Sequence, residues 1–414
     1  MTIQSVKPGR RLASLSALMT VSVLTRLLVN TANQLFFPFL AVMAAGMGTD
    51  VVVLGRLLGL RSLMGIFALL FDGLAERWGY RSAMRAELLI GVAGLVLVGA
   101  SANLWSALLG MLLMGLGFYS FVPTLRAYLS FQIPYAHRAR GFGILEYSWA
   151  LSGIVGLYAM GRLIDWVGWR APFFVLAAGL IVAWFVFGNL PPTERSATVR
   201  PAAPVLGVAQ RVHQFFTFAS NRRSAWGAIF AGALVNFGVL HIFTVYGVWL
   251  ADGYGLQAGQ LGTVALVFGG VDLCGSVLVS LVADRLGKRR SVLFGLAGCL
   301  ALFILLPVLD RSLVWVVAAL ALSRFFFEFG TVSHMSLVSE QVPSQRGKVV
   351  TLSFATGVVG GALSGFTGPL AYAEYGVAGL APVGAVAVAL GYLLIWGWVK
   401  EPLDEHRASF TIVN

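Results

Sequence analysis

The stretch GLAERWGYR, residues 73–81, interrupts a long apolar run with one acid, two arginines and two glycines before the chain turns apolar again. A second stretch, VADRLGKR at residues 282–289, repeats its pattern 208 positions later, which is about half of the 414-residue chain. Four positions match in chemical type: Glu76 with Asp284, Arg77 with Arg285, Gly79 with Gly287 and Arg81 with Arg289. This repeat predicts a protein built from two duplicated halves.

The composition indicates that the chain lies in a membrane. Hydrophobic residues make up 58% of the chain and charged residues 11%, whereas a soluble domain carries roughly 25% charged residues. No Asp, Glu, Lys or Arg occurs in the segments 88–125, 171–193, 291–309, 349–373 and 375–399. Each can cross a bilayer as a helix of about 20 residues. The uniform apolar runs favour helices over the alternating strands of a membrane barrel.

The apolar runs predict an all-α integral membrane protein with twelve spans in two six-helix halves. The halves cover residues 1–190 and 224–414, and the linker 191–223 is rich in Pro, Ser and Arg. Within the linker, VLGVAQRVHQFFTF (205–218) is either a short interfacial helix or part of a solvated loop. The spans are expected at 13–44, 51–72, 82–102, 105–131, 141–163, 171–190, 224–250, 258–282, 291–309, 312–340, 349–371 and 376–399.

The positive charges predict the orientation of the chain. Most of the 29 Lys and Arg fall at the two ends or in alternate connections, while the opposite loops hold Arg162, Arg170 and Arg311. Basic loops stay on the cytoplasmic side, so we expect a multi-pass protein of the bacterial inner (plasma) membrane with both termini in the cytoplasm. The net charge of +12 is then explained by topology, and no nucleic-acid partner is expected.

The residues favour a transporter over an enzyme. The sequence has no evident nucleophile–base pair, metal cluster or phosphate-binding loop, and we expect no cofactor and no metal. Cys274 and Cys299 both lie in apolar runs and indicate neither a disulfide framework nor a metal site. Two repeated halves in the same orientation are typical of transporters with a central substrate site.

Four motifs resemble those of the major facilitator superfamily. GLAERWGYR and VADRLGKR are similar to its loop 2–3 and loop 8–9 motif, and GRLIDWVGWRAPF (161–173) to its loop 5–6 sequence. GLGFYSFVPTLRAYL (115–129) followed by RARGFG (138–143) resembles its fourth span and the next loop. The stretch FGGVDLCGSVLVSLVADRLGKRR (268–290) is similar to the bacterial drug:proton antiporter and sugar-efflux branches.

The resemblance implies a monomeric secondary transporter that exports a small molecule in exchange for protons and contacts membrane lipid. Two departures from the antiporter pattern keep uptake by proton symport and facilitated diffusion open as alternatives. GIVGLYAMG (153–161) keeps the glycines of the fifth-span element but has no proline, and Met111 stands near the place of an arginine in the fourth span.

The resemblance also implies a cytoplasmic latch that holds the two halves together in the outward-open state. The alternative is a basic loop that only sets the topology. Arg126 and Glu146 lie nearer the cytoplasm than the central charges and are grouped with this gate. The gating residues are Gly73, Glu76, Arg77, Gly79, Arg81, Arg126, Glu146, Asp284, Arg285, Gly287 and Arg289.

Charged residues near the middle of a membrane are costly and therefore point to function. Asp272 and Glu328 are the candidate proton carriers. The alternative for Asp272 is a static ion pair, with Arg61 as the suggested partner, and the alternative for Glu328 is a pair with Arg324, four residues earlier. The candidate substrate and proton residues are Arg26, Asn30, Asn33, Gln34, Arg61, Asn236, His241, Asp272, Arg324 and Glu328.

Polar residues of the first span share one helical face. Positions 26, 30, 33 and 34 have helical spacing, and this face is expected to point at the transport cavity. Arg26 and Arg61 either bind an anionic group of the substrate or balance the acids. His241, which corresponds to Asn33 in the repeat, is a ligand, a proton site or a satisfied polar residue.

Overall fold

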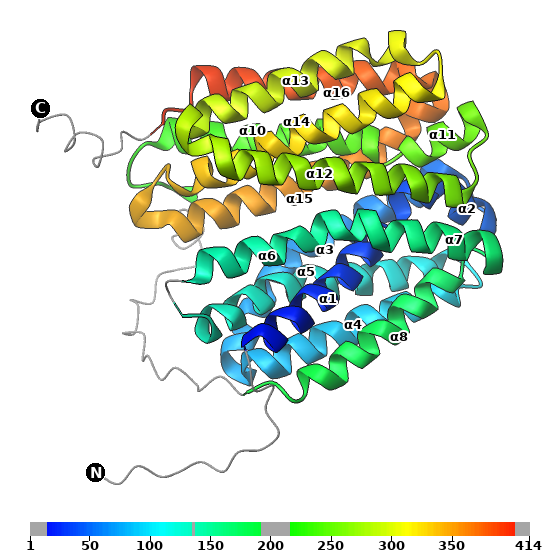
Figure 1. Ribbon diagram of the computed structural model, residues 1–414, viewed down its shortest axis with the longest axis horizontal. Helices are drawn as coiled ribbons and strands as arrows, with labels where there is room; N and C mark the ends of the chain where they lie inside the picture. Colours follow the sequence, from blue (N-terminus) through cyan, green and yellow to red (C-terminus); the bar gives the residue numbers. More distant parts are fainter. Residues whose placement is uncertain (1–14, 135–136, 192–215, 402–414) are drawn as a thin grey trace, which may run out of the picture. The chain divides into compact units, whose positions relative to one another are not determined.

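The computed structural model describes residues 15–134, 137–191 and 216–401, without the side chains at 68–74, 76, 139 and 284. Within these residues every regular element is a helix and no strand occurs, which confirms the predicted all-α class (Figure 1). Most of the segment expected to be either an interfacial helix or a loop, 205–218, lies outside the described residues.

The helices pack into two compact units. One groups the chain up to Thr198 with Tyr246–Gly270, and the other groups Val199–Val245 with the chain from Val271 onward. The first unit holds α1 (Leu15–Gln34), α2 (Phe36–Gly46), α3 (Val51–Trp78), α4 (Tyr80–Gly99), α5 (Leu104–Gln132), α6 (Arg138–Leu151), a π-helical segment (Ser152–Leu157), α7 (Tyr158–Val167), α8 (Ala171–Phe187), α11 (Tyr246–Tyr254) and the first part of α12 (Ala258–Leu286). The second holds α10 (Arg222–Phe243), the rest of α12, α13 (Lys288–Leu309), α14 (Leu313–Ser339), a 3-10 turn (Pro343–Gln345), α15 (Arg346–Tyr375) and α16 (Val377–Gly397).

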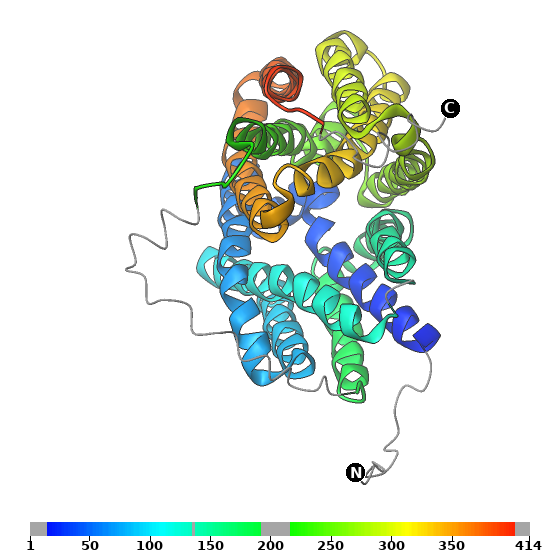
Figure 2. The same ribbon diagram turned by 90° about the vertical axis from the view of Figure 1, so that its left-hand side faces the viewer.

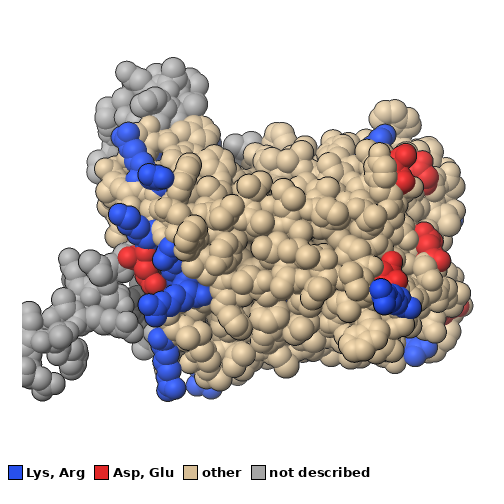
Figure 3. All heavy atoms as spheres, turned by 90° about the horizontal axis from the view of Figure 1, so that it is seen from above, with Lys and Arg blue, Asp and Glu red and all other residues tan. Residues whose placement is uncertain are grey.

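Ten helical segments of the described chain are long and apolar enough to cross a membrane. They coincide with ten of the twelve predicted spans. The predicted spans 51–72 and 171–190 correspond to α3 and to α8, and α8 is a shorter apolar helix of 17 residues. On the face shown in Figure 3, charged side chains gather toward the helix ends, and the wide stretch between them is uncharged.

Two predicted spans are broken rather than continuous. The span expected at 13–44 divides into α1 and α2, and Phe39 has non-helical angles of φ −110° and ψ 17°. Pro38 explains the break, because proline cannot donate the helical hydrogen bond to the carbonyl four residues earlier, which belongs to Gln34, the last residue of α1. The span expected at 224–250 likewise divides into α10 and α11.

The turns between helices reproduce the 208-residue repeat in backbone geometry. Gly79, between α3 and α4, has φ 85° and ψ 140°, and Gly287, between α12 and α13, has φ 87° and ψ 142°. A side chain strains the backbone at these positive φ angles, so glycine suits both turns. Gly168 and Gly376, also 208 residues apart, both have positive φ as well.

Glycines also let neighbouring helices approach closely. A Cβ atom at Gly94 of α4 would lie 2.5 Å from the carbonyl oxygen of Gly110 on α5, and one at Gly295 of α13 would lie 2.7 Å from Cα of Gly330 on α14. Figure 2 shows the helices of each unit from one end. Such close backbone contact leaves little freedom in the rotation of each helix, and this rotation decides which polar side chains meet.

Candidate functional site

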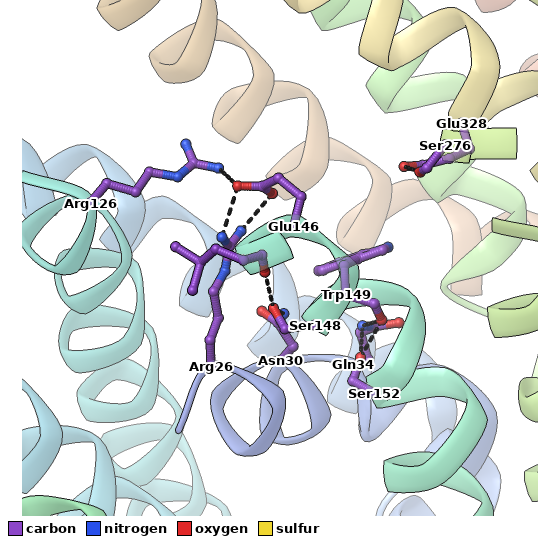
Figure 4. A network of polar contacts seen from close by, with 11 residues as sticks. Arg26, Asn30, Gln34, Arg126, Glu146, Ser148, Trp149, Ser152, Ser276 and Glu328 are labelled. Atoms are coloured by element: carbon purple, nitrogen blue, oxygen red, sulfur yellow. Dashed lines mark hydrogen bonds and ion pairs between the residues drawn. The ribbon is translucent and has the colours of Figure 1, made fainter. Parts of the chain in front are cut away.

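The polar face of α1 packs against α6 and the π-helical segment (Figure 4). Arg26 donates to both carboxylate oxygens of Glu146, from Nη1 to Oε1 at 2.8 Å and from Nη2 to Oε2 at 2.7 Å. Asn30 donates to Ser148 Oγ at 3.1 Å. One turn further, Gln34 Nε2 donates to Ser152 Oγ at 2.5 Å. The face expected to point at a cavity is thus paired with a neighbouring helix over three successive turns.

Glu146 joins two arginines in one cluster. Arg126 of α5 also donates to Glu146 Oε1, the oxygen that accepts from Arg26 Nη1 (Figure 4). The Arg26 side chain is 6% exposed, whereas those of Arg126 and Glu146 are 38% and 46% exposed. The sequence assigned Arg26 to the central set and the other two residues to the gate. In the structure the three form one group with two cations and one anion.

Asn33, the remaining residue of the predicted polar face of α1, faces α3 instead of α6. Arg61 Nη2 donates to the Asn33 carbonyl oxygen at 2.9 Å and to Asn33 Oδ1 at 3.0 Å. Arg61 is buried, with 4% exposure, and its guanidinium carbon lies 5.2 Å from the centre of the Phe36 ring. Arg61 is therefore held by neutral groups.

The second unit contains a buried ion pair between α12 and α14. Arg324 Nε donates to Asp272 Oδ1 at 3.0 Å, and its Nη2 donates to Asp272 Oδ2. Asp272 therefore forms its ion pair with Arg324, which corrects the partner suggested from the sequence, Arg61. One turn further along both helices, Ser276 Oγ donates to Glu328 Oε1 at 2.7 Å.

The two polar residues expected on the seventh span both contact α15. Asn236 donates to the Gly357 carbonyl oxygen at 2.7 Å, and His241 Nδ1 lies 2.9 Å from Thr367 Oγ1. His241 is 1% exposed. Its Nε2 atom is buried without a hydrogen-bond partner, so the contact with Thr367 satisfies one of the two ring nitrogens.

The last arginine of each repeated loop motif contacts a helix end. Arg81 donates to the Leu190 carbonyl oxygen beyond α8 at 3.0 Å, and Arg289 donates to the Trp396 carbonyl oxygen in the last turn of α16 at 2.5 Å. The second interaction satisfies one of the carbonyl groups that a helix leaves without a partner at its end. Arg77 and Arg285 are exposed. The gating positions Gly73, Glu76 and Asp284 lie among the side-chain positions that the structure leaves undescribed.

Sequence reasoning missed two carboxylates. Glu87 of α4 is 1% exposed and accepts a hydrogen bond from Thr124 of α5 at 2.8 Å. The sequence could have pointed to Glu87, because it is the sole acidic residue of the predicted span 82–102. Asp165 of α7 accepts a hydrogen bond from the backbone N–H of Gly259 on α12 at 2.9 Å. Asp165 lies within one of the quoted motifs, but its partner is 94 residues away.

Among the described side chains, no group of three or more His, Cys, Asp or Glu lies together in a way that could hold a metal ion. The polar clusters consist instead of arginines, carboxylates, amides and hydroxyls inside a helical membrane protein. Such groups can bind and release protons or polar solutes.

Comparisons with known proteins identify the family. The model of the Major Facilitator Superfamily matches residues 22–365, with a further match over 230–411. An uncharacterised MFS-type transporter of Bacillus subtilis strain 168, YwfA, is 26% identical over 389 residues, which span 90% of both chains. Multidrug resistance protein MdtG of Proteus mirabilis strain HI4320 is 26% identical over 351 residues, 81% of this chain and 82% of that protein.

Solved structures share the fold. A POT family transporter crystallised with 5-aminolevulinic acid has a TM-score of 0.73 at 14% identity, and the match covers 92% of this chain and 95% of that one. A variant of the nucleoside transporter NupG also has a TM-score of 0.73 at 14% identity, with coverage of 92% and 98%. The chain therefore belongs to the major facilitator superfamily, and it is a multi-pass membrane transporter of a small solute rather than an enzyme.

Proposed function

We propose that the protein exports a small solute from the cytoplasm in exchange for protons, as a monomer of the bacterial inner membrane. Its similarity to the multidrug resistance protein MdtG over most of both chains supports the outward direction. In this proposal α3 and α8 complete a set of twelve spans, and the halves 1–190 and 224–414 alternate in opening to each side. Both termini and the linker 191–223 are cytoplasmic.

The observation that carries proton coupling is the buried ion pair between Asp272 and Arg324, which are 3% and 8% exposed. A proton that binds Asp272 removes the negative charge that Arg324 contacts, and this loss is unfavourable for a buried cation. Glu328 lies one turn from Arg324 on the same helix, and its carboxylate can form an ion pair with the Arg324 guanidinium in place of Asp272. Protonation of Asp272 is thereby linked to a rearrangement of α12 against α14.

The test uses purified protein in proteoliposomes with an imposed pH gradient, a panel of drugs and other small solutes, and a pH-sensitive dye in the lumen. We expect at least one solute to accumulate against its gradient while protons move in the opposite direction. Asp272→Asn should bind this solute but lose both its accumulation and the pH dependence of binding. Glu328→Gln leaves the Asp272–Arg324 pair in place but removes the second carboxylate that can pair with Arg324, so it should keep the pH dependence of binding and lose accumulation.

Each contrary outcome identifies a different mechanism. Protons and solute that move in the same direction would indicate uptake by symport. Solute movement that does not depend on the pH gradient would indicate facilitated diffusion. If Asp272→Asn accumulates solute as the parent does, with the same pH profile, Asp272 is not the coupling residue.

A further inference from the structure

Arg61, near the middle of α3, is a buried cation that contacts no carboxylate among the described side chains. It is 4% exposed, and its Nη2 group donates to the carbonyl and side-chain oxygens of Asn33. No Asp or Glu among the described side chains forms an ion pair with it. The positive charge of Arg61 is therefore balanced by dipoles alone.

Most of the hydrogen-bonding capacity of Arg61 is also unused. A guanidinium carries five N–H donors, and Nε and Nη1, which hold three of them, are buried without a hydrogen-bond partner. The Phe36 ring, 5.2 Å away, offers an attractive π-face but accepts none of these bonds. A buried charge is ordinarily both paired and hydrogen-bonded, so Arg61 lacks an anion.

The other two buried arginines of the candidate site show what is missing. Arg26 is bound by Glu146, and Arg324 by Asp272, each through two hydrogen bonds to one carboxylate. At Arg61 the corresponding contact comes from Asn33, which has the shape of aspartate but no charge. The site thus presents an arginine whose carboxylate is absent from the described part of the chain.

We propose that Arg61 binds an acidic group of the transported solute, so that the substrates are small organic anions such as monocarboxylates. This inference rests on the proposed transport function, because the buried Nη1 and Nε groups become accessible when the helices around α3 move apart. An anionic oxygen that accepts from Nη1 supplies the missing charge. Asn33 positions the guanidinium by holding Nη2.

The first experiment measures binding without transport. Purified protein in detergent is titrated with chloride, acetate and benzoate, and thermal unfolding is followed. We expect acetate or benzoate to raise the Tm of the parent by at least about 2 °C near saturation. Arg61→Met should lose this rise. Arg56→Met, which removes an exposed arginine from the same helix, should retain it and thereby controls for non-specific ionic effects.

A second variant guards against failure of Arg61→Met to fold. Asn33→Asp places a carboxylate beside Arg61 with little change in shape, since Asn33 Oδ1 is already 3.0 Å from Nη2. We expect a higher Tm without added anions and no further rise with acetate or benzoate. A rise that persists in Asn33→Asp or in Arg61→Met overturns the proposal, as does a parent that responds to neither carboxylate.

The probes separate an inorganic anion from an acidic solute. If chloride alone raises the Tm, Arg61 holds an inorganic ion and the assignment of substrate class is wrong. In proteoliposomes, anionic solutes should be transported by the parent, with at least about a tenfold loss in Arg61→Met and less loss in Arg61→Lys. Transport of neutral or cationic solutes alone overturns the substrate class but leaves the proposed export function intact.

Discussion

The carboxylate of Asp165, on α7, accepts a hydrogen bond from the backbone N–H of Gly259 in the first turn of α12 at 2.9 Å. The first N–H groups of a helix have no partner within it, and the helix dipole favours an anion at this end. One turn earlier on α7, a Cβ atom at Gly161 would lie 2.6 Å from the Ala258 carbonyl oxygen. Asp165 therefore fixes two closely packed helices that are distant in sequence.

Loss of this contact should alter transport as well as stability. Asp165→Ala is expected to cost about 0.5–2 kcal/mol of unfolding free energy, as for other helix caps, and to change the turnover rate because α7 and α12 separate more easily. Asp50→Ala is the matched control, since Asp50 caps its own helix, α3, through Val53 N at 2.7 Å. It should lower stability with the turnover rate unchanged. Equal effects of both variants on turnover would show that Asp165 is only a local cap.

Adjacent glycines of α12 allow a direct test of the close packing. A Cβ atom at Gly269 would lie 2.6 Å from the Ala150 carbonyl oxygen, whereas one at Gly270 would meet nothing within 4 Å. Alanine favours the helix by about 1 kcal/mol at either position, but overpacking at Gly269 costs about 1–3 kcal/mol. We expect Gly269→Ala to lower the Tm and Gly270→Ala to leave it equal or higher. The reverse order would contradict the tight contact.

The ion pair between Asp272 and Arg324 should show strong coupling in a double-mutant cycle. Either Asp272→Asn or Arg324→Met removes one partner of a buried ion pair and is expected to cost about 3–5 kcal/mol of unfolding free energy. The double variant should cost less than the sum of the two, because both charges of the pair are then removed together. Denaturation of all four proteins in detergent measures the coupling, and simple additivity would argue against the pair.

In the cluster around Glu146, loss of Arg126 and loss of the Glu146 charge should have different effects on the unfolding free energy. Arg126 is 38% exposed, so Arg126→Gln should change the unfolding free energy by no more than about 1 kcal/mol. Glu146→Gln should destabilise the protein more, because the buried Arg26 loses its counter-ion. Thermal unfolding of both variants tests this order. A larger effect of Arg126→Gln would mean that Arg126 makes the principal contact.

The sequence was sufficient to predict the helical class, most span positions and the internal repeat. These properties depend on the composition of each segment, and the turn glycines Gly79 and Gly287 occupy equivalent positions in the two copies of the repeated motif. The division of the first span was not predicted, although Pro38 was visible, because a proline in a membrane helix produces anything from a slight bend to a break according to its neighbours.

The partners of the polar residues were harder to predict than the residues themselves. Arg324 has Glu328 one turn away, which is the nearest carboxylate in sequence, yet it forms its ion pair with Asp272, 52 residues earlier. Similarly, helical spacing placed Asn33 with Gln34, but these neighbours turn toward different helices. Partner choice depends on the rotation of each helix against the next, which is fixed by packing over the whole unit.

The π-helical segment Ser152–Leu157 joins α6 to α7 in one continuous helix and separates two sets of contacts that this helix makes. Before it, Glu146 and Ser148 meet α1, and after it, Gly161 and Asp165 meet α12. A π turn corresponds to one inserted residue within an α-helix, so deletion of a single residue here would turn everything that follows by about 100°. A change in the length of this segment should therefore be tolerated far less well than a substitution of its exposed residue Val155, because it would move Asp165 away from the start of α12.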